Sequence, residues 1–239
     1  MELYVIRHAQ STNNILTDSR DRVCDPPLTE LGQRQAKIVA HHLANGLNPE
    51  LSAWTPTGDN PTPYGYGITR LYCSPMWRAL QTAQPIGQAL GLAPEVWIDI
   101  HEQGGIFLDH GEAGGVVGYP GKTRQEILAD FPNYILPEGV TEQGWWKWGY
   151  EELGVCHGRA IKAAEELGKR ATSDERIAIV SHGGFIDALL KALFNQLPGY
   201  YLFYYHYNTA ISRIDFYSDG RLDFRYLNRV AHLPPGSIS

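Results

Sequence analysis

The stretch LYVIRHAQ at residues 3–10 places an arginine and a histidine directly after a run of strand-forming residues. The side chains at positions 3–6 are of the kind that favour a buried β-strand. In an α/β sheet, ligand-binding groups lie where the strands end. Arg7 and His8 therefore indicate that the first strand carries two nitrogen-rich side chains to a functional edge of a sheet.

Strand-like and helix-like segments alternate along the rest of the chain. The further predicted strands are 69–73, 95–100, 177–180, 210–217 and 222–227, and the last two read as a hairpin joined through Asp219 and Gly220. The predicted helices are 28–46, 74–91, a short one from 123, 150–169 and one that ends at 194. This alternation predicts an α/β fold, a three-layer α/β/α sandwich with a mixed, mostly parallel sheet.

Two of these helices carry start signals in the sequence. Ser74 and Pro75 are the residue types preferred at the N-cap and at the first helical position, so the second helix is expected to begin there. Thr123 and Glu126 have the spacing of a capping box at the start of the short helix.

No internal repeat and no linker divides the 239 residues, so a single domain, 1–239, is expected. Two insertions, at about 48–67 and 104–150, are predicted to form a cap or lid region. The first is rich in proline, glycine, threonine and asparagine. The second begins with seven glycines between Gly104 and Gly121, which argues against regular structure there.

The overall composition points to a soluble protein. A formal net charge of −6 argues against nucleic acid or an anionic membrane as the main partner. Three cysteines without a C-x-x-C spacing favour a reducing compartment and no disulfide framework. The chain shows neither a signal-peptide pattern nor a long uninterrupted apolar run, so a cytoplasmic location is predicted.

Chemistry-bearing side chains follow several of the predicted strands. These residues are Arg7 and His8 after the first strand, Arg78 after the second, Glu102 after the third and His182 after the fourth. If the strands are neighbours, the five side chains meet in one pocket. Such a set suits a phosphoryl group, because the arginine fork matches phosphate oxygens and the N-termini of helices add N–H donors.

A histidine in this pocket has the chemistry of a nucleophile. The reference pKa of histidine is about 6.5, and two neighbouring arginines push the pKa of His8 lower, toward the neutral form. A neutral imidazole can attack phosphorus and form a phosphohistidine. Glu102 could supply the proton that a leaving alkoxide needs.

Four motifs in the same order resemble those of the histidine phosphatase superfamily, also called the phosphoglycerate mutase-like family. RHAQSTNN at residues 7–14 is similar to the family signature R-H-G-[EQ]-[ST]-x-x-N, and SPMWRALQT at 74–82 is similar to S-P-x-x-R-A-x-Q-T. IHEQGG at 100–105 resembles the segment that holds the family's acid. VSHGG at 180–184 resembles the segment of its second histidine.

The resemblance implies a role for each of these residues. His8 would be the phosphorylated nucleophile, and Glu102 would be the proton donor and then the base for water. The phosphoryl oxygens would be held by Arg7, Arg78 and His182. The expected substrate-binding residues are Ser11, Asn14 and Gly183. No metal and no other cofactor is implied.

The chain departs from the family pattern at two places. Ala9 stands where the signature has glycine, which raises the question of the backbone conformation there. The segment after Glu102 is longer and richer in glycine than in compact members of the family. Glu112, inside that segment, is the alternative acid.

Three functions follow from the resemblance. The leading hypothesis is a phosphomonoester hydrolase that acts on a small organic phosphate, with no nucleic acid or membrane partner and an oligomeric state that the sequence does not determine. The alternative is a cofactor-dependent phosphoglycerate mutase. The mutase pattern has a tryptophan where this chain has Asn13, and its Y-G-x-L-x-G-L-N-K segment is absent, whereas segments 208–211 and 227–233 look like the phosphatase branch. The third hypothesis is a non-catalytic phosphate-binding module.

The aromatic run at 145–150 leaves two interpretations open. It is either packing for the cap region or one wall of a substrate pocket. His101 and Glu102 begin like a zinc-protease motif, but Gly105 stands where the second histidine would be, so that interpretation is rejected.

Overall fold

The computed structural model describes residues 1–48 and 64–239, and its centre is a six-stranded sheet in the order β3-β2-β6-β1-β7-β8. The strands are β1 (Glu2–Arg7), β2 (Arg70–Cys73), β3 (Glu95–Val96), β6 (Arg176–Ser181), β7 (Ile211–Phe216) and β8 (Leu222–Arg229). β1, β2, β3 and β6 run parallel, and β7 pairs antiparallel with both β1 and β8. The predicted mixed, mostly parallel sheet is therefore confirmed.

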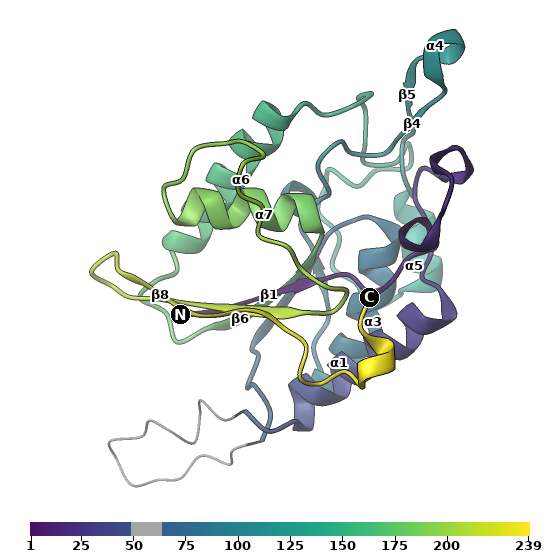
Figure 1. The fold of residues 1–239 in the computed structure, drawn as a ribbon. Coiled ribbons are helices and arrows are strands. Elements are labelled where there is room, and N and C mark those ends of the chain that lie inside the picture. The colour runs from purple at the N-terminus through teal and green to yellow at the C-terminus, as the bar shows by residue number, and fades with distance from the viewer. Residues whose placement is uncertain (49–63) are drawn as a thin grey trace, which may run out of the picture.

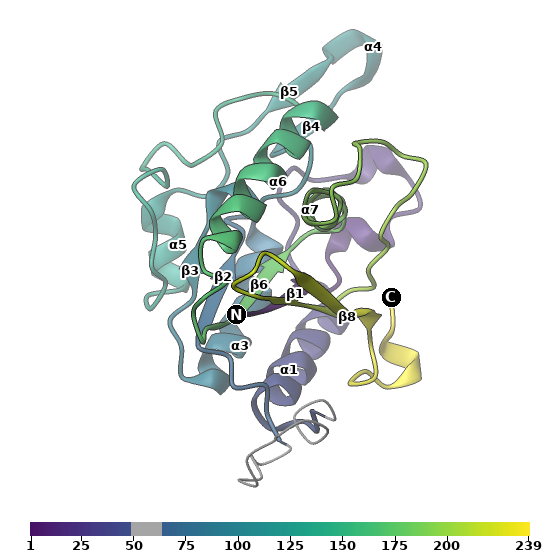
Figure 2. The ribbon, with the colours of Figure 1, turned by 90° about the vertical axis from the view of Figure 1, so that its left-hand side faces the viewer.

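Helices cover both faces of this sheet (Figures 1 and 2). α1 (Glu30–Asn45) and α3 (Trp77–Leu90) lie on one face, and α6 (Leu153–Gly168) and α7 (Gly183–Leu193) lie on the other. Alternate residues of β1 face opposite sides: Tyr4 and Ile6 belong to the apolar cluster with α1 and α3, and Leu3 and Val5 to the cluster with α6 and α7. The three-layer α/β/α sandwich is thus as predicted.

Three predicted element boundaries are wrong. α3 begins at Trp77 after Met76, not at Pro75, because the Ser74 hydroxyl accepts the Met76 amide within a turn before the helix. β3 ends at Val96, and a 3-10 turn at Ile98–Ile100 carries the chain away from the sheet edge. α6 begins at Leu153, three residues later than the pattern indicated.

The glycine-rich second insertion contains regular structure, contrary to the prediction. β4 (Phe107–Asp109) and β5 (Val116–Gly118) form a separate antiparallel pair, and the four-residue α4 (Gly111–Gly114) connects them. This hairpin extends away from the main sheet (Figure 1). Gly111 and Gly115 have positive φ angles, so two of the glycines serve the connection between the strands. The capping box of Thr123 and Glu126 is present at the start of α5 (Arg124–Asp130).

The first insertion, predicted at 48–67, falls largely on 49–63, outside the described residues. Its flanks join the fold at the C-terminal end of α1: Gly65 N donates to Gly46 O (2.8 Å), and Tyr66 N donates to Leu43 O (2.9 Å). The Tyr66 ring packs edge-on against Tyr4, with ring centroids 5.4 Å apart. Tyr66 therefore contributes to the apolar core on the face of the sheet that α1 and α3 cover.

Two further features concern the cysteines and the helices. Cys73 and Cys156 are buried, Cys24 is partly buried, and all three are free thiols. Within residues 1–48 and 64–239, no helix combines the length and the apolar character needed to cross a membrane.

Replacing Gly32 by alanine should destabilise the protein, because the start of α1 lies directly against the backbone that follows β1. A Cβ atom on Gly32 would lie 2.0 Å from the carbonyl oxygen of Gln10. We expect Gly32→Ala to lower the free energy of unfolding by about 1–3 kcal/mol through overpacking. Denaturant unfolding measures the change.

Gly158 in α6 is the matched control, since a Cβ there would meet no described atom within 4 Å. Gly158→Ala should raise the free energy of unfolding by about 0.5–1 kcal/mol through helix propensity. A Gly32→Ala protein as stable as the wild type would contradict the close approach.

Candidate active site

The register of three parallel strands brings the site residues together. Arg7 of β1 is opposite Ser181 of β6, and Cys73 of β2 is opposite Val180 of β6. His8 N donates to Ser181 O (2.8 Å), and Ser74 N donates to Val180 O (3.0 Å). His8, His182 and Ser74 therefore leave the sheet side by side at the carboxyl ends of adjacent strands.

His8 is held as a neutral imidazole with its electron pair on Nε2. Its side chain is buried, and Nδ1 lies 2.7 Å from the carbonyl oxygen of Ala9, an acceptor that requires the proton on Nδ1. Arg78 Nε donates to His8 Nε2 at 3.2 Å. Burial, followed by the charges of Arg78 and Arg7, holds the pKa of His8 well below its ordinary value of 6.5.

His182 faces His8 across the site. The two ring centroids are 5.0 Å apart, close enough for both imidazoles to contact one tetrahedral anion. His182 is completely buried and forms the N-cap residue of α7. Burial, with Arg78 and His8 as the next causes, lowers the pKa of His182 well below 6.5.

Both arginines lie close enough to His8 and His182 to act on them electrostatically. Arg7 Nη1 donates to His206 O at 2.5 Å, and Arg7 Nε is buried with no hydrogen-bond partner in the part of the chain that the structure describes. A Cβ on Gly183, the first residue of α7, would lie 3.7 Å from Arg7 Nε. The Arg7 side chain therefore lies against the N-terminus of α7, where helix amides also favour an anion.

Asp25 is a site residue that the sequence analysis missed. Its Oδ1 accepts the backbone N–H of Trp77 (2.9 Å) and lies 3.8 Å from Arg78 Nη1, while Oδ2 is buried without a partner among the described residues. Burial raises the pKa of Asp25 to about 6 despite the opposing charge of Arg78. No local motif announces this contact, because 53 positions separate Asp25 from Arg78.

Glu102 is bound to the start of α7 through one carboxylate oxygen. Oε1 accepts the backbone N–H groups of Gln103 (2.9 Å) and Phe185 (3.0 Å). A Cβ on Gly184 would lie 2.8 Å from Oε1, so glycine is required for this approach. The second oxygen, Oε2, has no protein partner among the described residues.

Glu112, the alternative acid, lies elsewhere. It is exposed in α4, in the connection at the outer end of the β4–β5 hairpin (Figure 1). The geometry favours Glu102 as the carboxyl group of the site.

A buried polar and aromatic cluster supports the segment that carries Glu102. Arg159 donates to both oxygens of Glu151 (3.0 and 2.6 Å) and to the carbonyl oxygen of His101 (2.9 Å). The rings of Trp145 and Trp146 lie 5.4 and 5.0 Å from the His101 ring, and both tryptophans are buried. Trp145 and Trp146 pack as part of the core, and Trp146, Trp148 and Tyr150 also line a cavity of about 680 Å³, so both interpretations of the aromatic run stay open.

The three predicted substrate-binding residues lie at two places around the pocket. Gly183 is at the N-terminus of α7. Ser11 is buried and donates from N (2.9 Å) and Oγ (3.0 Å) to Oδ1 of the exposed Asn14. With Oδ1 engaged, the amide group of Asn14 has its N–H bonds left for an acceptor. Asn208, which the sequence analysis did not assign to the site, donates from Nδ2 to His8 O (2.8 Å).

Ala9 fits the position where the family signature has glycine. Its φ angle is not positive, so alanine causes no strain there. Its methyl group packs in a small buried cluster with Leu28 and Ala36, and its backbone N–H bonds to Thr82 Oγ1 at 3.0 Å. The departure from glycine therefore leaves the backbone next to His8 in an ordinary conformation.

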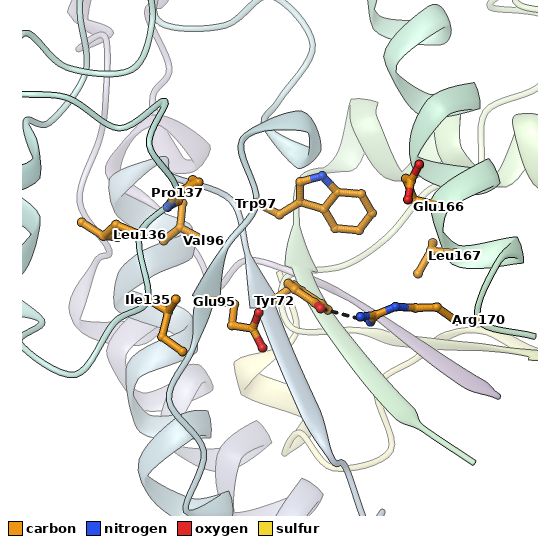
Figure 3. Close-up of a pocket in the computed structure, with 10 residues that line it drawn as sticks. All are labelled: Tyr72, Glu95, Val96, Trp97, Ile135, Leu136, Pro137, Glu166, Leu167 and Arg170. Carbon is orange, nitrogen blue, oxygen red and sulfur yellow. Dashed lines mark hydrogen bonds between the residues drawn. The ribbon is translucent and has the colours of Figure 1, made fainter. Parts of the chain in front are cut away.

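A separate pocket of about 360 Å³ lies at the β3 edge of the sheet, beside α6 (Figure 3). Arg170 Nη1 donates to the Tyr72 hydroxyl at 3.0 Å within it, and Glu95 is paired with Arg70. Its charged groups are satisfied by the protein, unlike the buried nitrogen atoms beside His8.

Among the described residues, no group of three or more His, Cys, Asp or Glu side chains could hold a metal ion.

The buried carboxyl group of Asp25 should make stability depend on pH. Its pKa is raised by burial from 3.8 to about 6, so its contribution is fully present below pH 3.8 and is lost as the pH rises through 6. We expect the stability of Asp25→Asn, relative to wild type, to increase by up to about 3 kcal/mol between pH 4 and pH 7. Urea unfolding across this range measures the difference.

Asp21→Asn is the matched control, because Asp21 is exposed in the same segment. Its stability curve should run parallel to that of the wild type. An Asp25→Asn curve that is also parallel would show that the carboxyl group ionises without cost.

Comparisons with known proteins agree with this geometry. The family model described as histidine phosphatase superfamily (branch 1) matches residues 3–53 and 64–228. A probable phosphoglycerate mutase GpmB of Yersinia pestis is 24% identical over 217 residues, which cover 90% of this chain and 85% of that relative.

Solved structures share the fold at lower identity. A mycobacterial glucosyl-3-phosphoglycerate phosphatase (TM-score 0.57, 21% identity) covers 96% of this chain and 99% of its own. YhfR of Bacillus stearothermophilus (TM-score 0.60, 20% identity) covers 97% and 98%. A phosphoserine phosphatase mutant of Entamoeba histolytica, in complex with phosphoserine (TM-score 0.55, 20% identity), covers 98% and 99%. With its sheet, its paired histidines and a family match over most of its length, the chain belongs to branch 1 of the histidine phosphatase superfamily.

Proposed function

We propose that this protein is a phosphomonoester hydrolase that acts on a small organic phosphate through a phosphohistidine on His8. The observation that carries the proposal is the buried pair of neutral imidazoles, 5.0 Å apart, with two arginines beside them. Neutral histidine is nucleophilic, and the arginines supply the positive charge that a phosphoryl group needs.

In the first step, His8 Nε2 attacks the phosphorus atom and a P–N bond forms as the P–O bond to the leaving group breaks. The proton stays on His8 Nδ1, hydrogen-bonded to the carbonyl oxygen of Ala9, which keeps the electron pair on Nε2 for the attack. Arg78 Nε, which donates to His8 Nε2, turns to the phosphoryl oxygens when they are present. Glu102 gives its proton to the departing alkoxide.

In the second step, Glu102 takes a proton from water as the water oxygen attacks phosphorus. The P–N bond breaks, inorganic phosphate forms, and His8 regains its electron pair. The two backbone N–H bonds to Glu102 Oε1 hold the carboxyl group in place for both proton transfers.

The phosphoryl oxygens have several donors available. The Arg7 Nε and His182 Nδ1 atoms are buried and have no partner in the described part of the chain. The N-terminus of α7 and the Asn14 amide add further N–H groups. Donors on several sides of one bound group would favour a tetrahedral anion over a planar carboxylate.

Phosphoglycerate mutase activity is the second candidate, favoured by the name of the Yersinia relative. The same two-step chemistry would then return the phosphoryl group to a phosphoglycerate instead of passing it to water. The chain lacks the mutase sequence features, and structurally similar proteins include phosphatases, so hydrolysis is preferred. A non-catalytic phosphate-binding module is disfavoured because His8, Glu102 and both arginines are present.

A direct comparison of the two reactions tests the proposal. Release of inorganic phosphate from a panel that includes phosphoserine and 3-phosphoglycerate is measured beside 2-/3-phosphoglycerate interconversion with the bisphosphate present. We expect hydrolysis to dominate for at least one ester, and His8→Ala to abolish it. His41→Ala, on the exposed face of α1, should keep the wild-type rate. Mutase turnover far above hydrolysis would reject the hydrolase.

Substitution of Glu102 tests the proton donor. Glu102→Gln should lower kcat/KM for alkyl phosphates by about 100-fold or more, because their leaving groups need a proton in the transition state. The loss for p-nitrophenyl phosphate, whose leaving group is stable as an anion, should be only a few-fold. Glu112→Gln, in α4, is the control and should match the wild type. Equal losses for both ester types would remove Glu102 from the role of acid.

A further inference from the structure

Ser74 is a completely buried serine whose hydroxyl contacts the second histidine of the site. Its Oγ lies 2.8 Å from His182 Nε2 and accepts the backbone N–H of Met76 at 3.2 Å. A hydroxyl has one proton to donate. Oγ accepts the Met76 amide and still has its own proton to donate, and the acceptor in contact with it among the described residues is His182 Nε2. That proton therefore goes to His182 Nε2.

This bond determines which nitrogen of His182 carries the proton. A neutral imidazole has one N–H group, and burial with the charge of Arg78 keeps His182 neutral. Because Nε2 accepts from Ser74, the proton is on Nδ1. His182 Nδ1 is buried and has no hydrogen-bond partner among the residues that the structure describes. The result is a buried N–H donor without an acceptor.

A second serine–histidine pair in the same protein shows what is unusual here. His206 Nε2 contacts Ser212 Oγ at 2.7 Å, and that hydroxyl also accepts a backbone N–H, from Asn228 at 2.9 Å. In this pair His206 Nδ1 meets the carbonyl oxygen of Tyr204 at 3.0 Å. The two pairs share one arrangement, but only His206 has a protein acceptor for its Nδ1–H.

We propose that Ser74 is a positioning residue that fixes the tautomer of His182, so that Nδ1–H donates to an oxygen of the bound phosphoryl group. The inference rests on the proposed function only in requiring that the site binds a phosphoryl group. Without Ser74, the proton would distribute between the two ring nitrogens, and the tautomer with an electron pair on Nδ1 would repel the anion.

The first test is ¹⁵N NMR of histidine side chains in the wild-type protein, with His182→Gln to assign the signal. We expect His182 as the Nδ1–H tautomer, and Ser74→Ala should shift it toward a mixture. Ser212→Ala is the matched control, since it should change the His206 signal and leave that of His182. A wild-type His182 protonated on Nε2 would overturn the proposal, even if Ser74→Ala failed to fold.

The second test is calorimetric binding of inorganic phosphate to wild type, Ser74→Ala, His182→Gln and the double variant. Ser74→Ala should weaken binding by about tenfold, the loss typical of one hydrogen bond to a charged group. In the His182→Gln background the same change should have little further effect, because Ser74 acts through His182. Equal weakening in both backgrounds, or no binding to the wild type, would overturn the inference.

Neither measurement uses turnover. A protein that binds phosphate with the expected coupling but hydrolyses no ester would reject the proposed function and keep the role of Ser74. A protein that hydrolyses phosphate esters but lacks this coupling would keep the proposed function and reject the role of Ser74.

Discussion

The parallel pairing of β6 with both β1 and β2 is the constraint on which the site depends. Backbone hydrogen bonds set the register, so the last residues of the three strands end at the same level of the sheet. His8, His182 and Ser74 follow those last residues and therefore lie in a row. A slip of one residue in either pairing would turn these side chains to the opposite face of the sheet. The same buried strands thus form the core of the fold and place His8, His182 and Ser74 next to one another.

Two buried nitrogen donors beside His8 have no hydrogen-bond acceptor among the described residues. Arg7 Nε and His182 Nδ1 are buried donors without an acceptor in the described residues, and a buried donor left unpaired costs about 1–3 kcal/mol. Arg78 Nη1 lies 3.8 Å from the carboxylate of Asp25, and Arg78 Nε donates to His8. The burial of apolar side chains on both faces of the sheet offsets this loss of stability. An anion in the pocket would satisfy these groups together, which is how a site becomes organised before its ligand arrives.

The carboxyl group of the site is supported differently from the histidines. Glu102 follows a short 3-10 turn outside the sheet, so no strand register places it. Its position comes from the backbone N–H groups of Gln103 and Phe185, from the Arg159–Glu151 ion pair and from the packed rings of Trp145 and Trp146. The second insertion therefore contributes to the position of Glu102, in addition to forming the β4–β5 hairpin.

The sequence by itself determined the sandwich, the ends of β1, β2 and β6, and the residue types that gather there. These follow from local periodicity and from motifs such as the one around His8, because a strand and the residue after it are neighbours in the chain. Only the tertiary structure decided which distant residues complete the site. Asp25 lies 3.8 Å from Arg78, and Gly184 has no side chain, which leaves room for the Glu102 carboxylate. Ser74 forms a hydrogen bond with His182, 108 positions away. Such contacts depend on strand order and on close packing between elements, and local periodicity carries no information about either.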